Sequence, residues 1–509
     1  MFSINTKLVI FPFLFSIFPI ILLYSDNIDE VPNTELIAPL ILTFLITLAL
    51  FTFLNFILKN SIKAGFIVTL LSAIFFSYGY IFNMLEYTFL FDFDLIHHRY
   101  VLLPFIISFI VGVYYFVKTK RNFTGFGSIF NVISIVMILF VSINIATFYL
   151  ENDDSHELLR LTLEDKLLPN NAFPDIYHII LDEYTSSQVL QEDFQYDNSD
   201  FIEYLINSNF LVPSNPLSNY PSTEPFLSST LSMQYLTRTN SEKYDRLETE
   251  RNISDNFVMK FLKHQGYKII VPYSGYGTPD RYLESDENPC SDVMFLKSRF
   301  LTELTRTTII NYFIEKQIEN ERRYIQLCAL SELSDIGKKY DVPVYALSHL
   351  LIPHAPYLFD KDGNAVTPQS NKLKGIQGWN NANGYLNEIQ FINKKIESIT
   401  TEILSQSNNS IIIIQGDTGS SILNNPDIDD YIKKRLSVLF AIHLPNGDKK
   451  IFPDTTTSAN IYRVIFNNYF ETNYEILDDR YFWYSEFENS DVGRKKFIDI
   501  TDIIKPPKL

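Results

Sequence analysis

Four short stretches of the 509-residue sequence carry residue types that could do chemistry. Asp182 ends the apolar run Ile-Ile-Leu, and Asp417 lies between glycines in Gln-Gly-Asp-Thr-Gly. Thr223 follows Asn-Tyr-Pro-Ser, while His349 and His354 belong to the proline-containing stretch His-Leu-Leu-Ile-Pro-His. Carboxylates and imidazoles can bind a divalent metal, and imidazoles can also donate hydrogen bonds to an oxyanion. A hydroxyl at a helix N-terminus suits an anionic phosphate or sulfate group and stabilises an alkoxide.

Each of these residues also has an ordinary structural interpretation. Asp182 could cap the helix that follows it. Thr223 could be a plain N-cap with Pro225 in the first turn. For Asp417 the flanking glycines favour a metal ligand, because they let the backbone approach a ligand closely. The two histidines favour function, because a proline-punctuated loop is an unusual place for core residues.

The elements that must position these residues alternate along the second part of the chain. Short runs rich in branched apolar residues predict strands at 176–181, 267–271, 342–348, 411–415 and 436–443. Helical patterns lie between them at 198–207, 224–235, 255–265, 301–319, 385–405 and 459–470. Alternation of this kind predicts an α/β domain with a mostly parallel, doubly wound sheet. Ligands bind such sheets at the carboxyl ends of the strands, which is where the candidate residues fall.

The first 150 residues have a different pattern and predict a helical transmembrane bundle. Apolar runs at 8–24, 36–58, 64–85, 100–117 and 126–150 approach or exceed the roughly 20 residues that a membrane-spanning helix needs. We expect five spans, with four or six as alternatives. The predicted division is a transmembrane domain at 1–150, a juxtamembrane linker at 151–173 and an α/β domain at 174–509. His97 and His98, between two spans, are expected to be solvated loop residues.

Charge sets the expected orientation in the cytoplasmic (inner) membrane. The loops after the second and fourth runs are basic, with Lys59 and Lys63 in one and Lys118, Lys120 and Arg121 in the other. The positive-inside rule places these loops in the cytoplasm. After five spans, residues from 151 onward then lie outside the cytoplasm, tethered to the membrane by the last helix.

Composition excludes several classes of protein. The net charge of -17 argues against nucleic-acid binding, which needs a basic surface. With 15% aromatic residues the chain is not disordered. Two cysteines exclude a disulfide-rich scaffold and a four-cysteine zinc site. Cys290 and Cys328 are expected to be two separate thiols rather than a disulfide.

Taken together, the motifs resemble the alkaline phosphatase superfamily from Pro174 to the C-terminus. The branch that they resemble is the membrane-anchored sulfatase-like proteins, which include lipoteichoic acid synthases and phosphoethanolamine transferases. The matching features are the strand ending in Asp182, the segment Asn-Tyr-Pro-Ser-Thr223, the pattern His-x4-His-x-Pro-Tyr357 and Gly-Asp417. The resemblance covers about two-thirds of the chain, and the order and spacing of the motifs are more specific than any one of them.

The resemblance implies a role for each residue. Asp182, Asp417 and Thr223 would hold one divalent metal, zinc or manganese. Thr223 would be the nucleophile, and His349 and His354 would steady the anion or protonate the leaving group. Such an enzyme would hydrolyse or transfer phosphate- or sulfate-ester groups on envelope glycans or lipids, and the resemblance does not distinguish the two reactions.

One departure from the family pattern weakens this expectation. The chain has Asp417-Thr418-Gly419 where the family has Asp-His-Gly, and losing an imidazole ligand should weaken zinc binding severely. His178 and His443 are near predicted strands but are expected to be core or rim histidines. The alternatives are therefore a catalytically degenerate relative that binds anionic envelope glycans, or a scaffold protein of the envelope.

Overall fold

The computed structural model of the chain describes residues 8–28, 31, 33–88, 98–151, 173–236, 246–278, 281–293, 298–366, 381–422, 427–447, 451–452, 457–484 and 497–504. The chain divides into two compact units. One contains Met1–His156 and Phe295–Ile318, and the other contains Glu157–Met294 and Glu319–Leu509. The sequence predicts that Phe295–Ile318 belongs with the α/β domain, whereas the structure groups this segment with the N-terminal helices. The predicted linker falls almost wholly outside the described residues.

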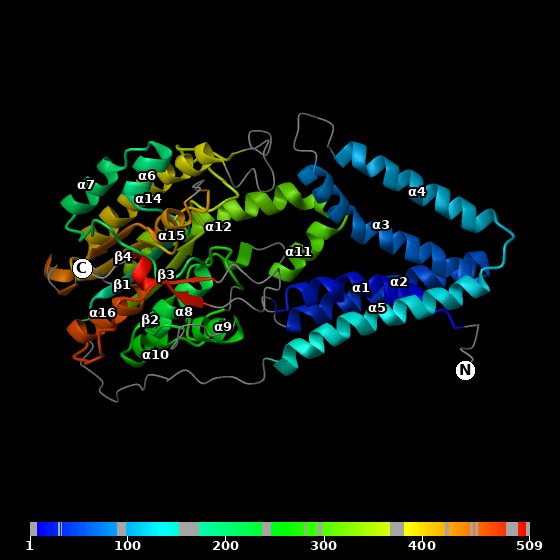
Figure 1. Cartoon of the computed structure of the whole chain (residues 1–509), viewed down its shortest axis with the longest axis horizontal. Helices are drawn as coiled ribbons and strands as arrows, with labels where there is room; N and C mark the ends of the chain where they lie inside the picture. Colours follow the sequence, from blue (N-terminus) through cyan, green and yellow to red (C-terminus); the bar gives the residue numbers. More distant parts are fainter. Residues whose placement is uncertain are drawn as a thin grey trace. The chain divides into compact units, whose positions relative to one another are not determined.

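The N-terminal unit is a bundle of apolar helices (Figure 1). Its helices are α1 (Phe11–Asp26), α2 (Asn33–Leu58), α3 (Ser61–Thr88), α4 (His98–Lys118) and α5 (Thr124–Glu151). The last four are long and apolar enough to cross a membrane, which confirms the transmembrane bundle. α1 has 16 residues, or about 24 Å at 1.5 Å per residue, and is shorter than a full span. The count of five spans therefore stays a prediction.

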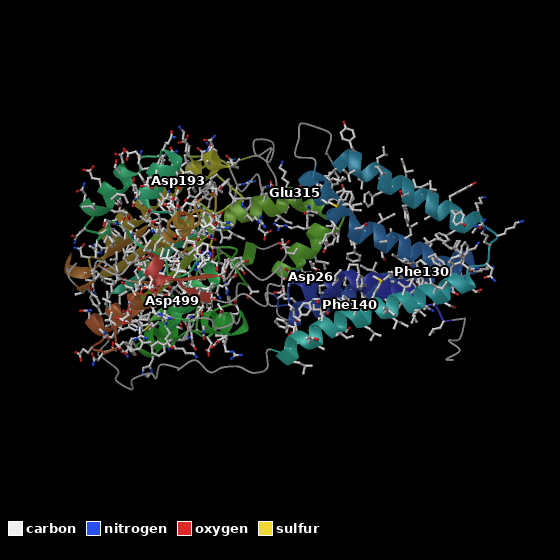
Figure 2. The ribbon with its side chains drawn as sticks, viewed as in Figure 1. Asp26, Phe130, Phe140, Asp193, Glu315 and Asp499 are labelled. Carbon is white, nitrogen blue, oxygen red and sulfur yellow. A yellow bond between two sulfur atoms is a disulfide. The ribbon has the colours of Figure 1, made fainter. Side chains whose placement is uncertain are left out.

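Polar and aromatic contacts hold α1 inside the bundle. The Asn131 side chain on α5 accepts hydrogen bonds from the backbone N–H groups of Ile10 and Phe11 at 3.1 and 3.0 Å. These donors have no partner within the helix, so Asn131 caps its start from a neighbouring helix. Phe130 packs its ring 5.8 Å from that of Phe11, whereas Phe140 on the same helix is exposed (Figure 2). An apolar side chain exposed in this way suits contact with lipid.

His98 is not the solvated loop residue that the sequence predicts. It begins α4, and its Nδ1 shares a hydrogen bond of 2.8 Å with the Tyr78 hydroxyl. Its ring also stacks on Phe82 with centroids 3.7 Å apart. His98 is thus a packing residue between α3 and α4, and His97 lies outside the described residues.

The second unit is built on a five-stranded sheet. Its strands are β1 (Asp175–Leu181), β2 (Lys268–Ile270), β3 (Val344–Leu350), β4 (Ser410–Gly416) and β5 (Phe440–His443). Their order is β2-β3-β1-β4-β5, with β1 to β4 parallel and β5 antiparallel to β4. The predicted mostly parallel sheet is confirmed. The strand predicted at 436–443 is shorter than expected, because helix α15 (Ile428–Leu436) continues to Leu436.

Helices cover both faces of this sheet, as Figure 1 shows, so the strands are buried on both sides. Tyr177, Ile179 and Leu181 of β1 pack on one face, while Ile176 and Ile180 pack on the other. The first face is covered by α6 (Ser187–Phe194), α7 (Ser199–Asn207), α12 (Asn311–Lys339) and α14 (Ala382–Gln406). The second is covered by α8 (Thr223–Ser232), α9 (Arg246–Ser254), α10 (Phe257–His264) and α16 (Ile461–Tyr469). The domain is therefore doubly wound, as predicted.

Cys290 and Cys328 form a disulfide, and the expectation of two separate thiols was wrong. Their Cα atoms are 5.9 Å apart although 38 residues separate them in the sequence. This distance lies within the range that a disulfide requires. The pairing depends on the loop after β2 folding back to α12, and sequence separation does not reveal such a contact.

Candidate metal and nucleophile site

The site begins where three neighbouring parallel strands end. In the sheet register, Leu181 of β1 lies opposite Leu350 of β3 and Gly416 of β4, and each of these residues is the last of its strand. Asp182 and Asp417 therefore follow their strands at the same edge of the sheet. This is the position at which open α/β sheets bind ligands.

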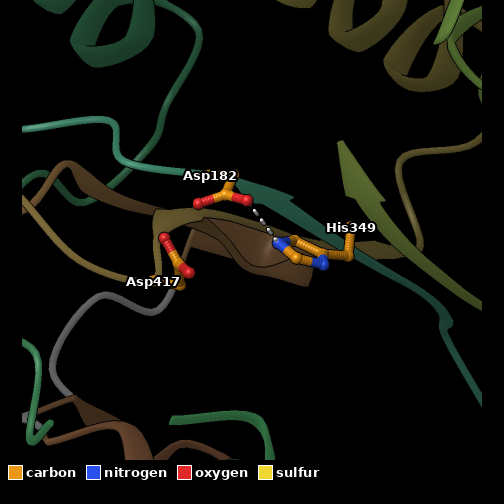
Figure 3. A group of neighbouring side chains, drawn as sticks. All are labelled: Asp182, His349 and Asp417. Carbon is orange, nitrogen blue, oxygen red and sulfur yellow. Dashed lines mark ion pairs between the residues drawn. The ribbon is translucent and has the colours of Figure 1, made fainter. Parts of the chain in front are cut away.

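Three buried side chains meet at this edge (Figure 3). Asp182, His349 and Asp417 each offer one ligand atom, and these atoms lie within 4.8 Å of one another. The His349 Nε2 atom is 3.7 Å from Asp182 Oδ2. Burial is the main cause that lowers the pKa of His349 to about 3, so the imidazole is neutral at neutral pH. The 3.7 Å contact therefore brings two ligand atoms together rather than forming an ion pair.

The three residues fit a divalent metal. Neither ring nitrogen of His349 has a hydrogen-bond partner among the described groups, although both are buried. Burial, and next the nearby carboxylate of Asp417, raise the pKa of Asp182 well above its usual range. A bound cation would relieve this repulsion between buried carboxylates. Two carboxylate oxygens and a neutral imidazole nitrogen are a donor set that zinc accepts, and imidazole and carboxylate also suit manganese.

Thr223 lies beside these carboxylates at the start of α8. Its Oγ1 donates a hydrogen bond of 2.6 Å to Asp417 Oδ2. The N-cap of α8 is Ser222, so Thr223 is the first residue of the helix and not its cap. Free backbone N–H groups at this end of a helix favour negative charge. The hydroxyl is therefore placed between a buried carboxylate and a site suited to an anion.

Glu183 is part of the site although the sequence analysis did not single it out. It has a positive φ of 62°, and its backbone N–H donates to Asp417 Oδ1 at 3.0 Å. Its carboxylate pairs with Arg435 Nη1 at 3.0 Å. Burial acts to raise the pKa of Glu183, but Arg435 and then His354 outweigh it and the net pKa is lowered. Glu183 thus stays ionised while its backbone orients Asp417. Its place directly after Asp182 at a strand end was the available signal in the sequence.

His354 is not one of the buried triad of Asp182, His349 and Asp417. It follows Pro353 directly, and with Ala355 it lies between two prolines whose peptide bonds, Ile352–Pro353 and Ala355–Pro356, are both cis. Its side chain is 29% exposed, and its Nε2 is 3.9 Å from Glu183 Oε1. The structure therefore separates the two histidines that the sequence analysis treats alike, since His349 belongs to the triad and His354 to its partly open rim.

Three further residues, Thr418, His178 and His443, concern the position after Asp417, where the family pattern has a histidine. Thr418 is buried, and its Oγ1 has no hydrogen-bond partner in the described part of the chain. His178 bonds through Nδ1 to the Tyr462 hydroxyl at 2.7 Å, and His443 bonds through Nδ1 to the Ser410 carbonyl at 3.0 Å. Neither belongs to the triad, so both behave as the core or rim histidines expected. The only imidazole among the described residues that joins the two carboxylates comes from β3.

A helical transmembrane bundle followed by this doubly wound domain defines a membrane-anchored member of the alkaline phosphatase superfamily. A model of the family described as Sulfatase matches residues 174–466. This is more than half of the chain, and the protein belongs to the sulfatase family.

The chain is similar to three solved structures at low sequence identity. The C-terminal periplasmic domain of EcEptC from Escherichia coli, solved with zinc, is 12% identical with a TM-score of 0.44, covering 66% of this chain and 96% of its own. The integral membrane lipooligosaccharide phosphoethanolamine transferase A of Neisseria meningitidis is 13% identical with a TM-score of 0.41, covering 90% and 95%. A protein from a glycosaminoglycan-metabolism locus of Bacteroides thetaiotaomicron is 13% identical with a TM-score of 0.39, covering 63% and 82%. No curated protein matches the chain.

Proposed function

We propose that the protein is a membrane-anchored enzyme that acts outside the cytoplasm on phosphate or sulfate esters. Its substrates would be cell-envelope glycans or lipids, and it would either hydrolyse the ester or transfer the group to an acceptor. The observation that supports this most is the 2.6 Å hydrogen bond from Thr223 to Asp417 at a helix start. Membership of the sulfatase family supports phosphate or sulfate esters as the class of substrate.

We assign one divalent metal, zinc or manganese, to Asp182, Asp417 and His349, with the Thr223 hydroxyl beside it. A metal bound there would supply positive charge that lowers the pKa of the hydroxyl and offsets the charge of the substrate anion. This assignment changes the role that the family resemblance implies for His349. The residue becomes a metal ligand, and it supplies the imidazole that position 418 lacks.

The chain's own residues account for the remaining steps of the proposal. Thr223 Oγ1 forms a bond to phosphorus or sulfur, and its proton has an acceptor in Asp417. The bond to the leaving-group oxygen breaks, and that oxygen takes a proton, which we assign to the partly exposed His354. Water or an acceptor hydroxyl then attacks the covalent ester and gives its proton to His354. The bond to Oγ1 breaks, and Oγ1 recovers its proton from Asp417. The N–H groups at the start of α8 favour the anion throughout.

The test is complementation in cells, because it needs no guess about the substrate. Thr223→Ala should abolish function, since no other described group is placed to form the covalent ester. Ser222→Ala is the matched control, because its hydroxyl contacts Tyr484 rather than the buried triad. Both variants should reach the membrane in equal amounts by immunoblot. Full function of the Thr223→Ala strain would remove the proposal of a threonine nucleophile.

Thr418 favours a second candidate, a catalytically degenerate relative that binds anionic envelope glycans or serves as a scaffold. The residue puts an unpaired hydroxyl where the family resemblance places an imidazole. Such a protein would keep its cellular function after Thr223→Ala. In such a protein Thr418→His would bring metal without turnover of any ester.

A further inference from the structure

A segment of the sulfatase sequence belongs to the membrane unit. Residues 295–318 lie inside the family match, yet they group with the N-terminal helices. Helix α11 (Arg299–Thr307) starts this segment, and Ser298 caps it by accepting a hydrogen bond from the Leu301 N–H at 3.0 Å. The sequence predicts one tether, the last helix of the bundle. The structure adds a second membrane-associated stretch far along the chain.

The apolar side of α11 packs on the bundle. Phe300 and Leu304 belong to a cluster with Ile20 and Tyr24 of α1 and Phe76 of α3. The spacing of four residues places both side chains on one face of α11. This face is therefore already covered and does not need another partner.

Backbone and polar contacts fix the same segment in place. The Phe300 N–H donates to the Glu35 carboxylate of α2 at 3.3 Å, and Ser298 also donates to it. The Ile309 N–H donates to the Phe75 carbonyl of α3 at 3.2 Å. A Cβ on Gly79 would lie 2.1 Å from the Arg306 carbonyl oxygen, so glycine is needed for α3 and α11 to approach this closely. Glu35 lies in the first turn of α2, while Phe75 and Gly79 lie within α3, so α11 is fixed to two helices of the bundle.

Large apolar side chains emerge directly after α11. Ile310 and Tyr312 are each 42% exposed, and Phe313 is 71% exposed. They belong to the membrane unit and follow Ile309, which is bonded to α3. The polar pair Glu303 and Arg306, 2.6 Å apart, precedes them. A short apolar stretch with aromatic side chains beside charged residues is typical of the membrane–water interface.

We propose that Ile310, Tyr312 and Phe313 contact the bilayer that the bundle crosses, at the boundary between headgroups and acyl chains. The partner is a lipid surface rather than a second copy of the chain. The exposed residues belong to the same compact unit as helices that carry many exposed apolar side chains, including Leu45 and Phe140. The same bilayer that covers those faces extends to the residues after α11. This proposal does not depend on the metal or on Thr223.

Site-directed spin labelling of the full chain in phospholipid bilayers tests it. The described residues include no free cysteine, so an introduced cysteine is the only thiol that reacts. Labels would be placed at Phe313→Cys and, as a second position, Ile310→Cys. Leu45→Cys is the lipid-exposed control, and Ile428→Cys on α15 of the other unit is the aqueous control, with an exposure of 68%.

The measurement is the accessibility of each label to oxygen, which partitions into lipid, and to a water-soluble nickel chelate. Labels at 313 and 310 should favour oxygen several-fold more than the label at 428, and should approach the label at 45. Equal accessibility ratios at 313 and 428 would overturn the proposal. So would low accessibility to both reagents with spin–spin broadening, because that result means contact with a second copy.

Discussion

The Glu183 carboxylate has a charged partner in Arg435, and its backbone serves the site as well. It pairs with Arg435 in a setting where the two side chains are 6% and 13% exposed. Its carbonyl accepts a hydrogen bond from the Tyr385 hydroxyl at 2.8 Å, and its N–H holds Asp417. A residue with a positive φ is strained unless its surroundings hold it, and here they do so from three sides.

Breaking the buried ion pair between Glu183 and Arg435 should lower the stability of the protein. Glu183→Gln leaves the Arg435 charge without its partner, and we expect the free energy of unfolding to fall by roughly 3–5 kcal/mol. The double variant Glu183→Gln, Arg435→Gln should lose less than the sum of the two single variants, because the charges are coupled. Unfolding of the full chain in detergent, followed by circular dichroism, measures these differences.

An exposed pair provides the control. Glu402 pairs with Lys338 at 2.6 Å, but both side chains are nearly half exposed. Glu402→Gln should change the free energy of unfolding by less than about 1 kcal/mol. Additive losses in the Glu183 and Arg435 variants would show that their ion pair does not stabilise the site.

The sequence was sufficient to place Asp182 and Asp417 at strand ends and Thr223 at a helix start, because both kinds of position are visible in apolar periodicity. It was not sufficient to place His349, which was expected in the loop after the strand. That histidine is inside β3, and a shift of one residue in the register would turn its side chain to the opposite face. Glu183 was missed for a related reason, since its function depends on a backbone conformation and on an arginine 252 positions away that only the fold brings close.

Helix α14 is hydrogen-bonded to the segment that follows His354. Glu388 is buried on this helix, and its Oε1 accepts a hydrogen bond from the Phe359 N–H at 3.1 Å and another from Leu358. Burial raises the pKa of Glu388 from 4.5 to about 8. The protonated form is therefore the one that the folded state favours.

This arrangement predicts a pH-dependent stability. The folded-state pKa lies above the unfolded value, so the contribution of Glu388 is complete below pH 4.5 and is lost as the pH rises toward about 8. The loss is up to about 5 kcal/mol, at 1.36 kcal/mol for each pH unit. Glu388→Gln keeps an acceptor oxygen and does not titrate, so its stability relative to the wild type should improve as the pH rises through this range.

Melting temperatures of the two full-length proteins between pH 5 and pH 8.5 would test this expectation. Glu402→Gln serves again as the exposed control and should run parallel to the wild type. If the melting temperatures of Glu388→Gln and the wild type change with pH in parallel, the buried carboxyl does not titrate in this range.

Strands and long helices were predicted more reliably than their ends. The four parallel strands were expected within a few residues, because their apolar runs are continuous. The predicted helix at 301–319 is in fact α11 and the first part of α12, which extends to Lys339. The break between them at Thr308 is fixed by contacts with the bundle, which a local pattern does not contain.

The whole chain combines a membrane unit and a sulfatase-fold unit, and we propose that the second lies outside the cytoplasm. The disulfide between Cys290 and Cys328 agrees with a location outside the cytoplasm, because disulfides persist in oxidising compartments. We also propose that α1 crosses the membrane, which gives five spans. The sequence predicts a membrane unit followed by an α/β unit. It does not predict that residues 295–318 group with the membrane helices, because an amphipathic helix in an α/β domain is expected to cover the sheet.

Reporter fusions test the orientation. An export-dependent reporter fused at Asp153 should be active, and the same reporter fused at Lys120 should be silent, because the basic loop is retained in the cytoplasm. A cytoplasm-dependent reporter at the two positions should give the opposite pattern, which controls for expression. Activity at Lys120 with silence at Asp153 would reverse the orientation and place the sulfatase unit inside the cell.

The central claim is that Asp182, His349 and Asp417 together hold one divalent metal, and metal analysis of the purified full chain tests it most directly. We expect one equivalent of zinc or manganese in the wild type and at least a tenfold loss of affinity in His349→Gln. The matched control His443→Gln removes another buried histidine and should keep the metal. In the His349→Gln background, Thr418→His should restore binding and Thr418→Gln should not. A His349→Gln protein that binds metal as tightly as the wild type, or a wild type that takes up no metal, would contradict the account.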